Sequence, residues 1–126
     1  MRIFQNQKFE QFAIRNRISL NAICDVVREL SSGLIHANLG GGVYKQRIAR
    51  AGQGKSGGFR GIVFFRVESR IFFVVGFAKN DKSSLSPHEL ASLKVFAKEF
   101  FSYDEQQIEC LLANRSLLEI FCKDAV

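Results

Sequence analysis

The sequence predicts an α+β fold in which helices from both ends of the chain flank a small antiparallel β-sheet. Apolar residues recur at helical spacing in the first third, aromatic and β-branched residues alternate in the middle third, and helix start signals return after residue 85. The chain has 126 residues, of which 47% are hydrophobic and thirteen are Phe, enough for one packed core. We therefore expect a single domain over residues 1–126.

Two helices are predicted in the first third. Apolar residues at helical spacing predict the first helix over residues 7–16. The second is predicted over residues 20–32, after a candidate cap at Ser19, and its apolar stripe consists of Ile23, Val26, Val27 and Leu30. Gly33 follows this stripe, where a helix often ends on a left-handed residue.

Three strands are predicted in the middle third, as an antiparallel meander over residues 43–50, 59–67 and 70–79. Only two residues separate the second strand from the third, the length of a tight hairpin. Lys45 and Arg47 share one face of the first strand. They join Arg60 on a common face of the sheet in one of the two alternative registers.

The last third returns to helix. Ser86, Pro87 and Glu89 form a helix start with a cap, a proline at the first helical position and a capping glutamate. A second capping pattern at residues 102–105 predicts a short helix that ends near Asn114. Residues 117–121 are too few to decide whether a final strand follows.

Positive charge is concentrated in the middle of the chain. The net charge is +6, yet residues 43–82 alone hold nine Lys/Arg against two Asp/Glu, a local net charge of +7. Clustered cations attract phosphates at long range, which predicts a polyanionic partner. The alternative is a solvated basic face without a ligand.

The cysteines and histidines show no spacing typical of a metal site. The chain has an odd number of cysteines, which lie far apart in the sequence: Cys24, Cys110 and Cys122. Neither of its two histidines, His36 and His88, has another metal-ligand residue at a typical spacing. We expect reduced thiols, structural histidines, no metal and no cofactor. The amino terminus lacks the apolar core of a signal peptide and no apolar run is long enough to span a bilayer, so we expect no membrane contact and a cytoplasmic protein.

A glycine-rich segment, residues 49–58, comes close to the phosphate-binding P-loop. Ala49 stands where the motif needs its first glycine, and a strand rather than a helix is predicted after Ser56, which argues against nucleotide hydrolysis. The remaining prediction is a flexible loop whose amides and Lys55 approach phosphates closely. A long hairpin turn is the structural alternative.

Three segments in order carry a family resemblance: LGGGVYKQRIAR at residues 39–50, GQGKSGGFR at 52–60 and GFAKNDK at 76–82. Together they resemble the RelE/HigB-type toxins of bacterial type II toxin–antitoxin modules. The resemblance implies a RelE-like fold and an endonuclease, an mRNA interferase, that binds and cuts mRNA, often on the ribosome, and so inhibits translation. It also implies a cognate antitoxin encoded next to the toxin as its partner.

The same resemblance implies the site. The implied catalytic residues are Lys55, Arg60 and Lys79, and the implied RNA-binding residues are Lys45, Arg47, Arg50, Gly54, Asn80 and Lys82. The arginine in the second strand is implied to stabilise the transition state. A lysine crowded by other cations loses its proton more easily, so a lysine is a candidate base.

Two departures from RelE keep alternatives open. Asn80 stands where RelE has a second arginine, and Ser86 stands near the position of a RelE tyrosine. A differently organised nuclease and an inactive nucleic-acid-binding relic both fit these departures. A third alternative is a toxin of the ParE type, which blocks DNA gyrase by protein contact and cuts nothing.

Overall fold

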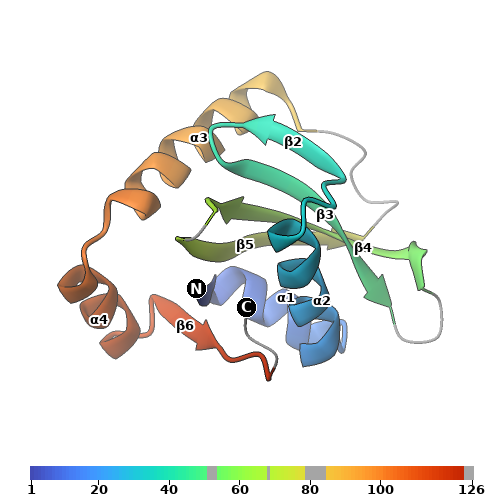
Figure 1. Cartoon of the computed structure of the whole chain (residues 1–126), viewed down its shortest axis with the longest axis horizontal. Helices are drawn as coiled ribbons and strands as arrows, with labels where there is room; N and C mark the ends of the chain where they lie inside the picture. The colour runs from blue at the N-terminus through green and yellow to red at the C-terminus, as the bar shows by residue number, and fades with distance from the viewer. Residues whose placement is uncertain (51–53, 68, 79–84, 124–126) are drawn as a thin grey trace.

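The computed structural model shows an α+β fold in which four helices surround one six-stranded sheet (Figure 1). It describes residues 1–50, 54–67, 69–78 and 85–123, with the backbone alone for 54–57. The strands are β1 Arg2–Asn6, β2 Ala37–Gly40, β3 Val43–Arg50, β4 Gly54–Phe65, β5 Arg70–Ala78 and β6 Leu117–Ile120. The helices are α1 Gln7–Arg15, α2 Leu20–Ser31, α3 Pro87–Ser102 and α4 Glu105–Ala113.

The strand order of the sheet is β2-β3-β4-β5-β1-β6. The predicted meander is confirmed, because β3, β4 and β5 pair antiparallel in sequence order. The amino-terminal strand β1 then pairs parallel to β5, and β6 pairs antiparallel to β1 at the far edge. The two ends of the chain therefore complete a sheet that its middle third begins.

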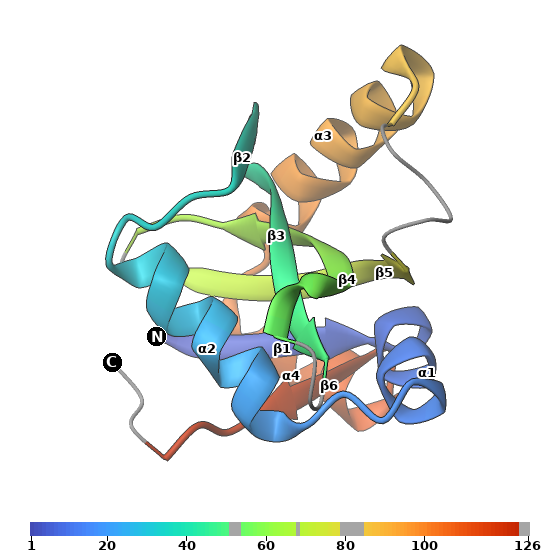
Figure 2. The same cartoon turned by 90° about the vertical axis from the view of Figure 1, so that its right-hand side faces the viewer.

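The two faces of the sheet bury separate apolar clusters. Helices α1 and α2 pack on one face through residues that include Phe9 and Val26, against Val63 and Phe73 of the strands. Helices α3 and α4 pack on the other face, where Ala97 and Ile108 meet strand side chains such as Ile62, Phe64 and Phe72. Figure 2 shows α2 and α3 on opposite sides of β3 and β4. Successive side chains of a strand point to opposite faces of the sheet, so a single strand contributes residues to both clusters.

Side-chain caps start the helices where the sequence predicts them. The Ser86 hydroxyl accepts a hydrogen bond from the Glu89 N–H at 3.1 Å, and the Glu89 carboxylate accepts one from the Ser86 N–H at 2.9 Å. The predicted capping box of α3 is therefore confirmed. Asp104 and Gln107 form the same reciprocal pair at α4, and Ser19 caps α2.

The hairpin between β4 and β5 is longer than predicted. β4 ends at Phe65, and the Ser69 N–H donates to the Arg66 carbonyl at 3.1 Å, so four residues rather than two connect the strands. Strands β1 and β2 were not predicted. Each has only four or five residues. β1 is a strand because it pairs with the distant β5, and β2 forms a hairpin with the neighbouring β3. The open question at residues 117–121 is answered by β6.

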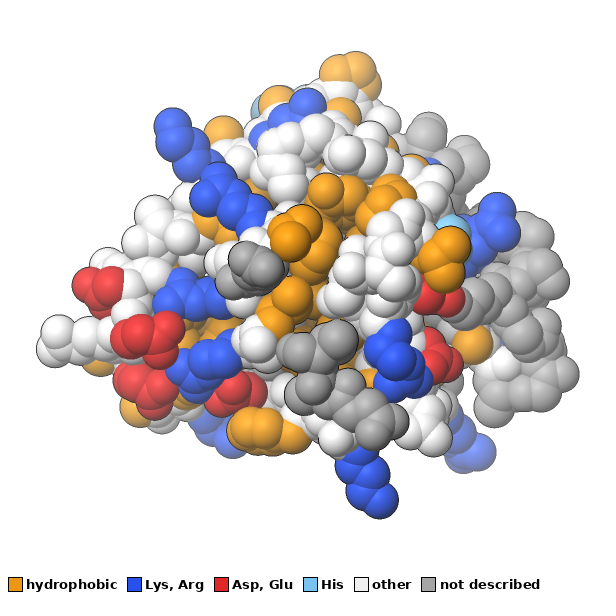
Figure 3. Space-filling view, viewed as in Figure 1, with side chains coloured by type: hydrophobic (Ala, Val, Ile, Leu, Met, Phe, Trp, Pro, Cys, Tyr) orange, Lys and Arg blue, Asp and Glu red, His pale blue; other side chains and the backbone are white. Residues whose placement is uncertain are grey.

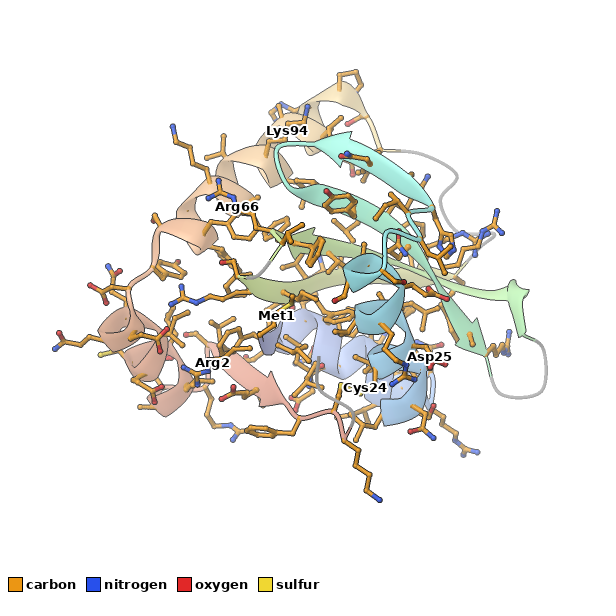
Figure 4. The ribbon with its side chains drawn as sticks, viewed as in Figure 1. Met1, Arg2, Cys24, Asp25, Arg66 and Lys94 are labelled. Atoms are coloured by element: carbon orange, nitrogen blue, oxygen red, sulfur yellow. A yellow bond between two sulfur atoms is a disulfide. The ribbon has the colours of Figure 1, made fainter. Side chains whose placement is uncertain are left out.

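The expectation of three reduced thiols is wrong for two of them. Cys24 of α2 and Cys122, just after β6, form a disulfide with their Cα atoms 5.8 Å apart (Figure 4 labels Cys24). The two residues are separated by 98 positions in the chain, so spacing in the sequence gave no sign of their contact. Cys110 is exposed and not paired. Within the described residues, no helix is both long and apolar enough to cross a membrane.

Three carboxylates of the carboxyl-terminal third form ion pairs with arginines. Arg2 of β1 forms ion pairs with Glu119 at 2.7 Å, Glu105 at 3.0 Å and Glu109 at 3.2 Å (Figure 4). Arg70 adds a second contact to Glu105 at 2.7 Å, and this hydrogen bond is the main reason that the pKa of Glu105 is lowered. These pairs connect α4 with β1, β5 and β6.

Candidate nucleic-acid interface

The register of β3 and β4 brings two arginines together. Arg47 and Arg60 are direct cross-strand partners, and Lys45 lies opposite Ile62 two positions along. Directly opposite residues of an antiparallel pair project from the same face. Ile62 belongs to the cluster under α3, so the three cations lie on the α3 face of the sheet. The prediction that they share a face is confirmed.

The Arg47–Arg60 pair concentrates positive charge. Partial burial lowers the pKa of Arg60, and the nearby charge of Arg47 lowers it further. Neither arginine forms an ion pair with the described part of the chain. Like charges directly opposite each other destabilise a sheet, so this arrangement favours an anionic ligand that neutralises both.

His36, which precedes β2, joins this pair. Its Nδ1 accepts a hydrogen bond from the Arg47 backbone N–H at 2.8 Å. Burial lowers the pKa of His36, and the charges of Arg47 and Arg60 lower it further. The imidazole is therefore neutral at pH 7 and carries its proton on Nε2, since Nδ1 is the acceptor. In this tautomer Nε2–H can donate to an anion but cannot accept a proton.

A fully buried glutamine holds His36 in this position. Gln46 has no exposed surface, its Nε2 donates to the Leu34 carbonyl at 3.2 Å, and its Oε1 accepts from the His36 N–H at 2.8 Å. Both contacts satisfy backbone groups of the segment between α2 and β2. Gln46 is thus a positioning residue for His36. The sequence gave no sign of this role, because it depends on pairing across ten and twelve positions of the chain.

The structure separates Arg50 from the other cations. Its guanidinium carbon lies 5.4 Å from the centre of the Phe59 ring. Phe59 belongs to the cluster under α1 and α2, on the opposite face from Arg60. The RNA-binding role of Arg50 stays a prediction, for a residue that does not share a face with Arg47 and Arg60.

The glycine-rich segment is strand from Gly54 onward, not a loop throughout. Gly54 is the Cα partner of Arg50, and Lys55 and Ser56 continue β4. The side chain of Lys55 lies outside what the structure describes. No helix follows Ser56, so the segment is not a P-loop.

The remaining predicted site residues follow β5. Lys79, Asn80 and Lys82 lie outside the described residues. The last residue of β5, Ala78, is the Cα partner of Phe59, and Phe77 is the partner of Arg60. The end of β5 therefore lies beside the Arg47–Arg60 pair.

His88 lies in the first turn of α3 and is exposed. Among the described residues, no group of three His, Cys, Asp or Glu side chains is arranged to hold a metal ion. The functional groups that the described residues bring together are therefore guanidinium, ammonium and neutral imidazole. These groups bind phosphates by charge and by hydrogen-bond donation.

Comparison with known proteins identifies the family of this chain. No curated protein sequence matches the chain. The model of the RelE toxin of the RelE/RelB toxin–antitoxin system matches residues 1–120, nearly the whole chain. Together with an α+β fold of four helices and a mostly antiparallel sheet, this match shows that the chain belongs to the RelE toxin family.

Proposed function

We propose that this toxin is an mRNA endonuclease that works on the ribosome and so inhibits translation in the cytoplasm. The observation that carries the proposal is the cross-strand pair of Arg47 and Arg60, with His36 bonded beside it and no described acidic partner. Such a group destabilises the free protein and is compensated when a phosphate binds.

The proposed reaction uses the RNA's own 2′-hydroxyl. Its oxygen attacks the adjacent phosphorus while the bond from phosphorus to the 5′-oxygen of the next nucleotide breaks. The hydroxyl proton passes to a base, and the leaving 5′-oxygen takes up a proton. Arg60 is proposed to stabilise the charge that builds up on the phosphorus oxygens.

The other predicted site residues are proposed to act as the base, as hydrogen-bond donors to phosphate and as RNA-binding groups. His36 cannot be the base in its bonded tautomer, so we assign it as a donor to a phosphate oxygen and keep Lys55 as the proposed base. Lys79 is proposed to complete the catalytic group. Lys45 and Arg47 bind neighbouring phosphates, and Gly54, Asn80 and Lys82 are proposed to contact RNA from the segments around them.

Membership of the RelE family implies an antitoxin partner. We propose that the product of the adjacent gene covers the Arg47–Arg60 pair. An acidic segment would neutralise both guanidinium groups and exclude RNA by occupying the same face.

The proposal is tested by inducing the chain in cells and mapping new 5′ ends of mRNA against ribosome position. We expect growth arrest, relief by the adjacent gene's product, and cuts confined to translated regions. Arg60→Ala should abolish the cuts, and Arg15→Ala on α1 should not, because Arg15 lies on the helix over the opposite face. Growth arrest with intact mRNA and inhibited DNA gyrase would instead identify a ParE-type toxin.

A further inference from the structure

A second basic site lies where the turn between β2 and β3 meets α3. The surface is hollowed there over about 590 Å³, between the glycine turn, the end of β4 and one side of α3. The cations that line the hollow are Arg66, Lys94 and Lys98. Figure 4 labels Arg66 and Lys94, which extend from the strand end and from the helix. In Figure 3, seen from the same side, blue side chains gather over α3 and the adjoining strand end.

The glycine turn is shaped to let a lysine lie against the backbone. Gly40, Gly41 and Gly42 have φ values of 91°, 63° and 82°, which favour glycine at each position. A Cβ on Gly40 would stand 3.2 Å from Nζ of Lys94, and one on Gly41 would stand 3.3 Å from its Cγ. Gly40 and Gly41 therefore leave room for the Lys94 side chain beside the bare backbone, and Gly42 leaves room for the Phe101 ring.

The cations of the hollow have no described acidic partner. The guanidinium carbon of Arg66 lies 4.5 Å from the centre of the Phe101 ring, a cation–π contact. No Asp or Glu lines the hollow, and within the described chain none of its three cations forms an ion pair. Tyr44 and Phe65 give the hollow an aromatic lining. Cations beside aromatic rings are typical of surfaces that bind single-stranded nucleic acid.

Arg66 of the hollow lies on the same face of the sheet as Arg60, since its guanidinium group contacts Phe101 of α3. Arg60 and Arg66 are six positions apart, so alternation puts both on the α3 side, about 20 Å from each other at roughly 3.3 Å per residue. This distance exceeds the Debye length of ~8–10 Å at physiological salt, so the two clusters attract different phosphates of one strand.

We propose that the hollow binds a backbone phosphate of the same RNA that is cut at Arg60. The inference rests on the proposed nuclease function and adds a second contact to it, several nucleotides away. An RNA strand suits both clusters because its phosphates recur regularly, whereas an acidic protein segment needs no bare glycine backbone beside a lysine.

Binding of the full-length chain to a 2′-O-methyl RNA 12-mer tests this site, since that probe lacks the attacking hydroxyl and stays intact. Lys94→Gln/Lys98→Gln should weaken binding on the order of tenfold near 0.1 M salt and reduce the salt slope by about 0.7, the value for one phosphate contact on a single strand. The matched control Arg15→Gln/Lys123→Gln removes two charges elsewhere and should keep the wild-type slope. Arg66→Gln gives an independent check, and thermal unfolding shows that each variant is folded.

The outcomes separate this site from the nuclease itself. If the double variant has a reduced salt slope and the wild-type protein cuts no RNA, the result supports RNA binding by the hollow and contradicts the proposed nuclease function. If the wild-type protein cuts RNA and the double variant keeps the wild-type salt slope, the proposed RNA contact in the hollow is wrong and the proposed nuclease function stands. If the double variant keeps its RNA affinity but loses affinity for the adjacent gene's product, the hollow binds protein, and the proposal is wrong.

Discussion

Nδ1 of His36 accepts a 2.8 Å hydrogen bond from the backbone N–H of Arg47, and this bond couples the imidazole to the arginine pair. Folding lowers the pKa of His36 from its ordinary value of 6.5, through burial first and then the charges of Arg47 and Arg60. As pH falls below 6.5, the unfolded chain takes up a proton that the folded chain still excludes. The free energy of unfolding should therefore decrease from pH 6.5 down to the folded pKa.

His36→Gln should remove this part of the pH dependence. Chemical unfolding of wild type and variant between pH 5 and 8 measures this contribution. As pH falls below 6.5, the free energy of unfolding should decrease more in wild type than in His36→Gln. His88→Gln is the matched control, because His88 is exposed in the first turn of α3. Equal pH dependence in wild type and His36→Gln would contradict the coupling.

Neutralising one arginine of the Arg47–Arg60 pair should stabilise the protein. The two like charges are direct cross-strand partners, an arrangement that destabilises a sheet by about 0.2–1 kcal/mol. Arg47→Gln should therefore raise the free energy of unfolding while it weakens RNA binding. The gain should shrink at high salt, where the repulsion is screened. Loss of stability in Arg47→Gln, with Arg15→Gln unchanged, would show that the pair stabilises the fold.

Gln46→Leu should destabilise the protein and release His36. The change keeps the side chain's approximate size but removes its hydrogen bonds to the Leu34 carbonyl and the His36 N–H, at about 0.5–1.5 kcal/mol for each bond. Denaturant unfolding measures the loss, and amide hydrogen exchange at His36 should become faster. Gln11→Leu, on the exposed side of α1, should change stability by less than about 0.5 kcal/mol. Normal protection at His36 in Gln46→Leu would contradict the positioning role.

Reduction of the disulfide should lower stability, because Cys24 and Cys122 close a loop across 98 positions. A disulfide typically contributes about 2–4 kcal/mol, chiefly by restricting the unfolded chain. Cys122→Ser should lose this amount, whereas Cys110→Ser should not, since Cys110 is exposed and unpaired. Alkylation of the denatured, unreduced protein should modify one thiol per chain. Modification of three thiols would show that the pair is not formed.

The parts of the fold that depend on neighbouring residues were predictable from the sequence. Ser86 and Glu89 are three positions apart, so a local pattern predicted the start of α3. Alternation of side chains along β3 and β4 likewise predicted the common face of Lys45, Arg47 and Arg60, apart from the register. The register itself required the structure.

The parts that depend on distant contacts were not predictable from one sequence. β1 is a strand because β5 and β6 pair with it, and Cys24 meets Cys122 because α2 packs near the edge strand β6. His36 looked isolated in the sequence because its partners belong to β3 and β4. Arg50 lies on the face opposite Arg60, as alternation along β3 indicates and the family resemblance did not.

Single-turnover cleavage of mRNA on programmed ribosomes tests the central claim most directly, with wild type, Arg60→Ala and the control Arg15→Ala compared at equal folded concentration. If Arg60 stabilises the transition state, Arg60→Ala should cut on the order of a hundredfold more slowly or worse, a loss of about 2–4 kcal/mol. Its thermal stability should equal or exceed that of wild type, because the Arg47–Arg60 repulsion is gone. A folded Arg60→Ala protein that cuts at the wild-type rate would place the active site elsewhere and contradict the account.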